Sequence, residues 1–170
     1  LIATPSMSRD EYNVSLIIEG FFNEHQMIVN RFKNNIWATN KHFDAGKPSI
    51  LLNTHHDTVK PNKAYTLDPF IPVEKDGKLF GLGSNDAGGC LVSLIGTFVN
   101  FYKRDDLAFN LIVAPTAEEE ISGRDGLEAL LLKLGELDCA IVGEPTGMNM
   151  AMSEKGLMVI DAETIGIAGH

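Results

Sequence analysis

The chain has 170 residues, of which 44% are hydrophobic and 22% are charged, so it can form one globular core of ordinary domain size. Its formal net charge of −9 is spread along the sequence, which argues against a nucleic-acid or anionic-membrane partner. No apolar run approaches the roughly 18 residues of a membrane span, and no signal peptide is recognisable.

The first predicted element is a helix over residues 9–24. Ser8 followed three residues later by Glu11 is typical of a capping box at a helix start. Apolar residues at helical spacing follow, namely Val14, Ile17, Ile18, Phe21 and Phe22. Residues 27–32 and 35–39 then alternate in polarity on either side of a short polar break, which predicts two paired strands.

A buried strand over residues 49–53 is predicted next, and it ends in the polar motif NTHHDTV. His55 and Asp57 point the same way on an extended chain, so the aspartate could fix the ring of a metal-binding histidine. A lone His-x-Asp is more often a satisfied core histidine than a ligand. The motif alone therefore does not predict a metal site.

The next segment places an acid at the start of a helix. Asp76-Gly77 predicts a tight hairpin within residues 73–81, and a glycine-rich stretch then leads through Asp86 into a helix that ends near Lys103. A phosphate-binding loop is excluded here because no Lys-Ser/Thr pair follows and Asp86 would repel phosphate.

Two more apolar strands end in acids. Residues 107–114 lead into Glu118, Glu119 and Glu120, and residues 138–142 lead into Glu144, which the following proline holds extended. Three consecutive acids usually form a solvated loop, but these follow a buried strand directly. A helix over residues 124–134 separates the two strands.

This alternation predicts an α/β fold, with a mostly parallel sheet flanked by helices on both faces. The ends of its strands would gather one histidine and several carboxylates: His55, Asp57, Asp86, Glu118, Glu119, Glu120 and Glu144. Without cations these carboxylates would repel one another and raise each other's pKa. Two divalent ions would relieve this, and mixed ligation suits zinc, with Co²⁺ or Mn²⁺ as substitutes. An acid that binds no metal could then act as general base.

Five segments of the chain carry a family resemblance: NTHHDTVKP, DPFIPVEKDGKLFGLGSNDAGG, LIVAPTAEEE, DCAIVGEPT and EKG…GIAGH. In their order and spacing they resemble the dizinc metallohydrolase family of acetylornithine deacetylase, succinyl-diaminopimelate desuccinylase, aminoacylase and glutamate carboxypeptidase. The resemblance covers nearly the whole chain. It implies a cis peptide after Asp86. It also implies these roles: His55 and Glu144 as ligands of one zinc, Asp86 as the bridge, Glu120 as a ligand of the second zinc, Glu119 as general base, and Asp57 as the residue that orients His55.

The resemblance also implies that part of the enzyme lies outside this chain. The last metal ligand of the family is a histidine beyond His170. The family inserts a lid and dimerisation domain after the GEPT motif. We therefore expect residues 1–152 to form the N-terminal part of a zinc-peptidase-like catalytic domain, and residues 153–170 to be the truncated first strand of an α+β lid. His170 corresponds to a histidine that helps polarise the scissile carbonyl, often across a dimer interface.

The implied function is metal-dependent hydrolysis of a small-molecule N-acyl amino acid, first of all N-acetylornithine in arginine biosynthesis. The implied protein is a cytoplasmic homodimer joined through the lid. A desuccinylase or dipeptidase of the same family is the alternative, since lid residues choose the substrate. A non-catalytic homologue used for binding or dimerisation is an alternative of another class, although such a scaffold has no need of an unliganded Glu119.

The remaining histidines and the cysteines have ordinary structural interpretations. His25 and His42 lie in polar stretches and His56 points opposite to His55, so packing or solvent contact is expected for all three. Cys90 and Cys139 lie in apolar runs without zinc-knuckle or disulfide spacing, which predicts buried thiols in a reducing compartment.

Overall fold

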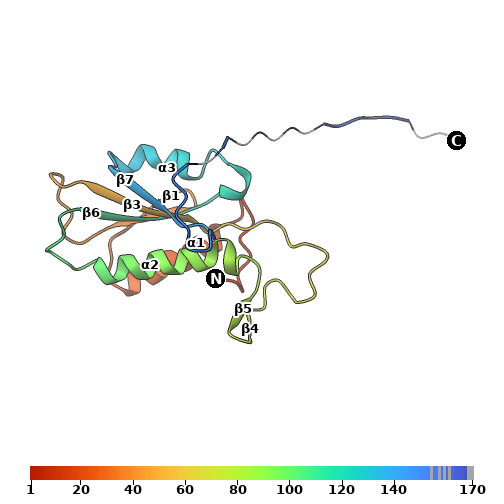
Figure 1. Cartoon of the computed structure of the whole chain (residues 1–170), viewed down its shortest axis with the longest axis horizontal. Coiled ribbons are helices and arrows are strands. Elements are labelled where there is room, and N and C mark those ends of the chain that lie inside the picture. Colours follow the sequence, from red (N-terminus) through yellow and green to blue (C-terminus); the bar gives the residue numbers. More distant parts are fainter. Residues whose placement is uncertain (154, 157, 159, 161, 168–170) are drawn as a thin grey trace.

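The computed structural model describes residues 1–153, 155, 156, 158, 160 and 162–167, and within them a five-stranded sheet forms the centre (Figure 1). Its strand order is β1-β2-β6-β3-β7. The bounds are β1 (Val29–Phe32), β2 (Asn35–Thr39), β3 (Ser49–His55), β6 (Asn110–Thr116) and β7 (Cys139–Val142).

The α/β prediction is confirmed, and the strands that lead into the acids run parallel to one another. Strand β3 pairs in parallel with both β6 and β7. The predicted hairpin of β1 and β2 joins the other side of β6 in antiparallel register. The three strands expected to deliver polar residues therefore end at the same edge.

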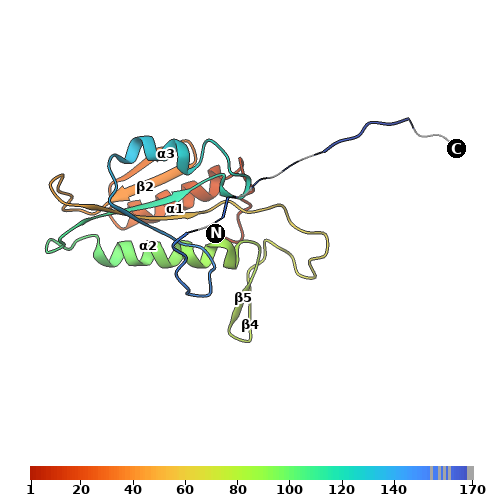
Figure 2. The ribbon, with the colours of Figure 1, turned by 45° about the horizontal axis from the view of Figure 1, so that its top comes forward.

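Helices cover both faces of the sheet, as Figure 2 shows. α1 (Tyr12–Glu24) and α2 (Cys90–Phe101) pack on one face, and α3 (Leu127–Leu134) packs on the other. Successive residues of β3 and β6 point to opposite faces of the sheet. Leu52 belongs to the hydrophobic cluster with α1 and α2, whereas Leu51 packs with Leu130 of α3. Both inner strands are consequently apolar along most of their length.

The predicted start of the first helix is wrong. α1 begins at Tyr12, and Glu11 at its N-cap makes no side-chain capping bond. Ser8 lies outside the helix, and its hydroxyl donates to Asp57 instead of accepting a backbone N–H at the helix start. The apolar face is also narrower than expected, because Ile17 and Phe21 are 44% and 38% exposed.

A small hairpin of β4 (Val73–Lys75) and β5 (Lys78–Phe80) confirms the turn predicted at Asp76-Gly77. Both turn residues have positive φ, 53° and 70°, as a tight two-residue turn requires. The hairpin extends away from the central sheet (Figure 1). None of the helices in the described residues is long and apolar enough to cross a membrane.

β7 is an exposed strand at one edge of the sheet, which corrects the prediction for the cysteines. Cys139 on β7 is exposed and Cys90 is only half-buried, and both are free. Past β7, the described residues up to 167 contain no helix or strand. The expected first lid strand falls partly on residues outside the described ranges, so the division at residue 153 stays a prediction.

Candidate metal centre

The carboxyl ends of three parallel strands place the predicted site residues at one edge of the sheet. His55 ends β3 opposite Thr116 of β6, after which the three glutamates follow, and Val142 of β7 pairs with Asn53 just before Glu144. Asp86 comes from a distorted helical turn, η1 (Ser84–Gly89), which contacts β3. Ligand atoms of His55, Asp86 and Glu144 all lie within 4.8 Å of one another.

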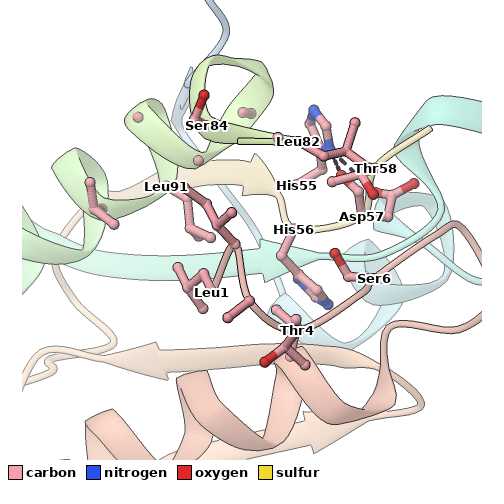
Figure 3. A pocket seen from close by; sticks show the side chains of 18 of the residues that line it. Leu1, Thr4, Ser6, His55, His56, Asp57, Thr58, Leu82, Ser84 and Leu91 are labelled. Atoms are coloured by element: carbon pink, nitrogen blue, oxygen red, sulfur yellow. Dashed lines mark hydrogen bonds and ion pairs between the residues drawn. The ribbon is translucent and has the colours of Figure 1, made fainter. Parts of the chain in front are cut away.

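His55 has two differently engaged ring nitrogens, and its side chain is 1% exposed. Nε2 lies 3.1 Å from Asp86 Oδ1 and 3.9 Å from a carboxylate oxygen of both Glu119 and Glu144. Nδ1 lies 3.3 Å from Asp57 Oδ1 and 3.0 Å from the Asp57 carbonyl oxygen (Figure 3). Nε2 therefore faces the acids while Asp57 fixes the ring from behind.

Asp57 is fully buried and accepts three further hydrogen bonds. Ser8 Oγ donates to Oδ2 at 2.7 Å, the Glu119 N–H donates to Oδ1 at 3.0 Å, and the Glu120 N–H donates to Oδ2 at 3.2 Å. Burial alone would raise the pKa of Asp57, but His55, Ser8 and the Glu119 amide lower it. One buried carboxylate thus joins the histidine to the loop of acids.

Glu119 and Glu120 begin a single 3-10 turn, η2 (Glu119–Ile121). The Glu119 side chain is 55% exposed. Glu120 lies outside the group of three ligand atoms described above, but it shares their electrostatic environment: burial raises its pKa, and so does the negative charge of Asp86. Glu118, the third acid, lines a different hollow beside Arg9 and Arg124.

The site favours positive charge, which is the behaviour expected of residues that would share a cation. Burial raises the pKa of Glu144, and repulsion from Glu119, Asp86 and Glu120 adds to it. Burial would lower the pKa of His55, but Asp57, Glu144 and Asp86 raise it to about 9. An imidazole nitrogen among carboxylates, with its other nitrogen held, is a donor set that fits a divalent ion.

Polar side chains tie the three strand ends together. The Thr54 hydroxyl donates to the Gly143 carbonyl at 2.8 Å, immediately before Glu144. The Asn53 amide donates to the Ala114 carbonyl at 2.9 Å and to Thr116 Oγ1 at 3.1 Å. Asn53 and Thr54 therefore fix the strand ends on either side of β3.

The turn that carries Asp86 is tightly packed. The Asp86-Ala87 peptide is cis, as the family resemblance implied. Gly83 has φ 71°, and a Cβ on Gly88 would lie 2.4 Å from the Gly83 carbonyl oxygen. Glycine is required at these positions because the chain folds back on itself around Asp86.

His56 points away from the acids, as expected. Its side chain is directed toward Thr4 and Ser6 (Figure 3) and lines a cavity of about 380 Å³ between the N-terminal segment and the start of α2. It is 5% exposed, and burial lowers its pKa to about 4. His25 and His42 are exposed. His170 lies outside the described residues.

Three residues next to the site carry no sequence signal for a role in it. The sequence predicts a helix cap at Ser8 and Glu11 and a strand at Asn35, yet all three bond to Asp57 or to the loop after β6. Glu11 and Asn35 are both 0% exposed. No local pattern distinguishes them, because their partners lie 49 to 107 residues away.

Comparison with known proteins gives one family. Residues 51–156 match the family described as Peptidase family M20/M25/M40. Acetylornithine deacetylases from Salmonella arizonae and Salmonella paratyphi B are each 34% identical to this chain, in alignments that cover all of it and 47% of the relative. The chain therefore spans about half the length of these relatives.

Solved structures share the fold. Human carnosine dipeptidase 1 aligns with 84% of this chain and 36% of its own, at a TM-score of 0.65 and 20% identity. A dinuclear metal-binding peptidase from Bacillus subtilis covers 84% of this chain and 39% of its own, at a TM-score of 0.63 and 20% identity. Since the family match covers more than half of the chain, with most of β3 and all of β6 and β7, the protein belongs to peptidase family M20/M25/M40.

Proposed function

We propose that the full-length protein is a dizinc amidohydrolase that removes the acyl group from a small N-acyl amino acid, first of all N-acetylornithine. One observation carries the proposal: His55 Nε2, Asp86 and Glu144 lie within 4.8 Å of one another, with Glu119 at 3.9 Å from the same nitrogen. The 34% sequence identity to acetylornithine deacetylases, which extends over the whole chain, supports an N-acyl amino acid as the substrate.

The proposed ligands divide between two ions. His55 and Glu144 would hold one zinc, Asp86 would bridge, and Glu120 would bind the second together with a ligand from beyond this chain. Co²⁺ or Mn²⁺ would be acceptable substitutes for zinc. When bound, such cations act as Lewis acids that polarise an amide carbonyl and make a water more acidic.

Glu119 is the proposed general base. Its side chain is half-exposed and lies 3.9 Å from His55 Nε2, and its backbone N–H donates to Asp57. In the proposed reaction its carboxylate takes a proton from the attacking water as the new carbon–oxygen bond forms. It then gives that proton to the leaving nitrogen as the carbon–nitrogen bond breaks. Glu119 thus finishes each turnover deprotonated.

An activity assay on the full-length protein tests the proposal. With zinc supplied, we expect hydrolysis of N-acetylornithine in preference to N-succinyl-diaminopimelate and to a dipeptide. Glu119→Gln should abolish turnover and leave the metal content unchanged. If either of the other two substrates is hydrolysed faster, the proposal of N-acetylornithine as the substrate is wrong. Full activity of Glu119→Gln would overturn the assignment of Glu119 as the base.

The proposal extends to the cellular setting of the enzyme. We infer a cytoplasmic homodimer joined through the lid, in which His170 helps to polarise the substrate carbonyl, and a role in arginine biosynthesis. Light scattering on the purified full-length protein measures its mass in solution. A monomer at assay concentrations would contradict the dimer.

A further inference from the structure

Four consecutive backbone N–H groups after β6 each donate a hydrogen bond to a buried side-chain oxygen from a distant part of the chain. These N–H groups belong to the residues that lead into and form the turn of acids. The pairs are Ala117 to Asn35 Oδ1 at 3.0 Å, Glu118 to Glu11 Oε1 at 3.2 Å, Glu119 to Asp57 Oδ1 at 3.0 Å and Glu120 to Asp57 Oδ2 at 3.2 Å.

The backbone of this turn needs such support. Glu118 and Ser122, on either side of η2, have φ of 58° and 48°. These angles lie in the left-handed region, which residues other than glycine rarely adopt. Such conformations persist only where neighbouring groups hold them in place. The direction of the Glu119 and Glu120 side chains follows from this backbone, since both residues lie between the two left-handed positions.

Glu11 is built into the fold as an acceptor. It is 0% exposed, and its carboxylate accepts from the Arg9 N–H at 2.6 Å, from Asn34 Nδ2 at 2.8 Å and from the Glu118 N–H. Burying a carboxylate is unfavourable unless donors satisfy it. Two of these donors fix the Glu11 carboxylate itself, and the third belongs to the turn of acids.

We propose that Glu11 is a positioning residue for the proposed hydrolysis. By holding the Glu118 N–H, it fixes the left-handed residue that sets the direction of Glu119, the general base, and of Glu120. The inference rests on the proposed function for its effect on catalysis. Its structural part, the restraint of residues 117–122, does not depend on that function.

Two substitutions at this position separate the acceptor from the charge. Glu11→Gln keeps one oxygen for the Arg9 and Glu118 amides, and the Asn34 amide can rotate to offer its oxygen to the new NH₂ group. Glu11→Ala leaves both backbone amides without their acceptor. We expect kcat of Glu11→Ala to fall roughly 10²-fold, as for a displaced catalytic group. KM should change little, and Glu11→Gln should restore most of kcat.

A destabilised control variant separates positioning from a loss of stability. Phe98 is 0% exposed in the core between α1 and α2, where it packs against Phe22 and Tyr102. Phe98→Leu should lower stability but leave kcat per folded molecule unchanged. An equal fall in kcat per folded molecule for Phe98→Leu and Glu11→Ala would overturn the proposal, and so would a Glu11→Gln variant as impaired as Glu11→Ala.

Amide hydrogen exchange of the metal-free full-length protein tests the restraint independently of activity. In residues 117–122, Glu11→Ala should exchange roughly tenfold faster than wild type, the factor expected when a hydrogen bond to a charged acceptor is lost. Glu11→Gln and Phe98→Leu should not. Unchanged exchange in Glu11→Ala would overturn the inference. If wild type hydrolyses none of the three substrates, the proposed function fails and this exchange measurement alone decides the role of Glu11.

Discussion

The Asp57 carboxylate contacts two parts of the candidate site. It lies 3.3 Å from His55 Nδ1, and it accepts hydrogen bonds from the backbone amides of Glu119 and Glu120. His55 and the acids that face it are therefore positioned by one buried group. This second contact joins residues 62 and 63 positions apart, which no local motif reveals.

Substitution Asp57→Asn tests this double role. The new NH₂ group can donate but not accept, so it must face at least one of the donors that Asp57 now accepts. We expect zinc affinity to fall about 10- to 100-fold, the usual cost of losing the group behind a metal-binding histidine. Titration calorimetry against a competing chelator measures it. Asp76→Asn removes the same charge from the exposed β4–β5 turn and should not change the affinity.

His55 should make the stability of the metal-free chain depend on pH. Its pKa is about 9 in the folded chain against 6.5 for the free side chain, so the folded state binds this proton more tightly. The stabilisation is fully present below pH 6.5 and is lost as pH rises through about 9. Urea unfolding of metal-free protein across this range should show the decline.

The control for this pH dependence is a variant that lacks the imidazole of His55. In His55→Asn the decline between pH 6.5 and 9 should disappear, because the imidazole with a pKa of about 9 is gone. A wild-type stability that rises over this range would contradict the assignment of the proton to His55.

At the level of elements, the turn from Gly83 to Gly88 determines where Asp86 lies. Gly88→Ala would place a Cβ 2.4 Å from the Gly83 carbonyl oxygen and force the turn open. We expect this variant to bind zinc more weakly than wild type while it keeps its secondary structure in circular dichroism. A variant with unchanged zinc affinity would show that the turn does not position Asp86.

Gly96 offers a matched control for this substitution. It lies on the exposed side of α2, where an added Cβ meets nothing within 4 Å. Gly96→Ala should therefore stabilise the helix by about 0.5–1 kcal/mol without changing zinc affinity. The pair separates the effect of an added methyl group from the effect of its location.

The order of elements could be predicted from the sequence because it depends on local patterns. The strands that end at His55, before Glu118 and before Glu144 each combine an apolar run with an abrupt change to polar residues, and burial on both faces of the sheet enforces the apolar run in β3 and β6. The Asp76-Gly77 turn follows from backbone preference alone. These features need no knowledge of distant partners.

The errors have two physical causes, namely distant partners and surfaces that the fold leaves uncovered. Ser8 and Glu11 match a capping box, but Ser8 donates to Asp57 and Glu11 accepts from the Glu118 N–H, both far away in the sequence. Cys139 and its neighbours on β7 form an apolar run that nevertheless lies exposed at an edge of the sheet. Periodicity shows which residues are apolar, but not which surfaces the rest of the fold covers.

Across the whole molecule, zinc should stabilise the folded state. A ligand that binds only the folded chain adds about 2.7 kcal/mol at a free concentration one hundred times its Kd. Thermal or urea unfolding of the full-length protein with and without zinc should show an increase of this size. Chelator should reverse it, and stability that does not respond to zinc would contradict a metal site formed on folding.

We propose that acids from separate parts of the sequence gather at one edge of the sheet because they share divalent cations. The decisive measurement is the number of zinc ions bound per chain, by equilibrium dialysis of the full-length protein. We predict two zinc ions for wild type and loss of both in Asp86→Ala, since Asp86 is the proposed bridge. A wild type that binds no zinc, or an Asp86→Ala variant that keeps both ions, would contradict the claim.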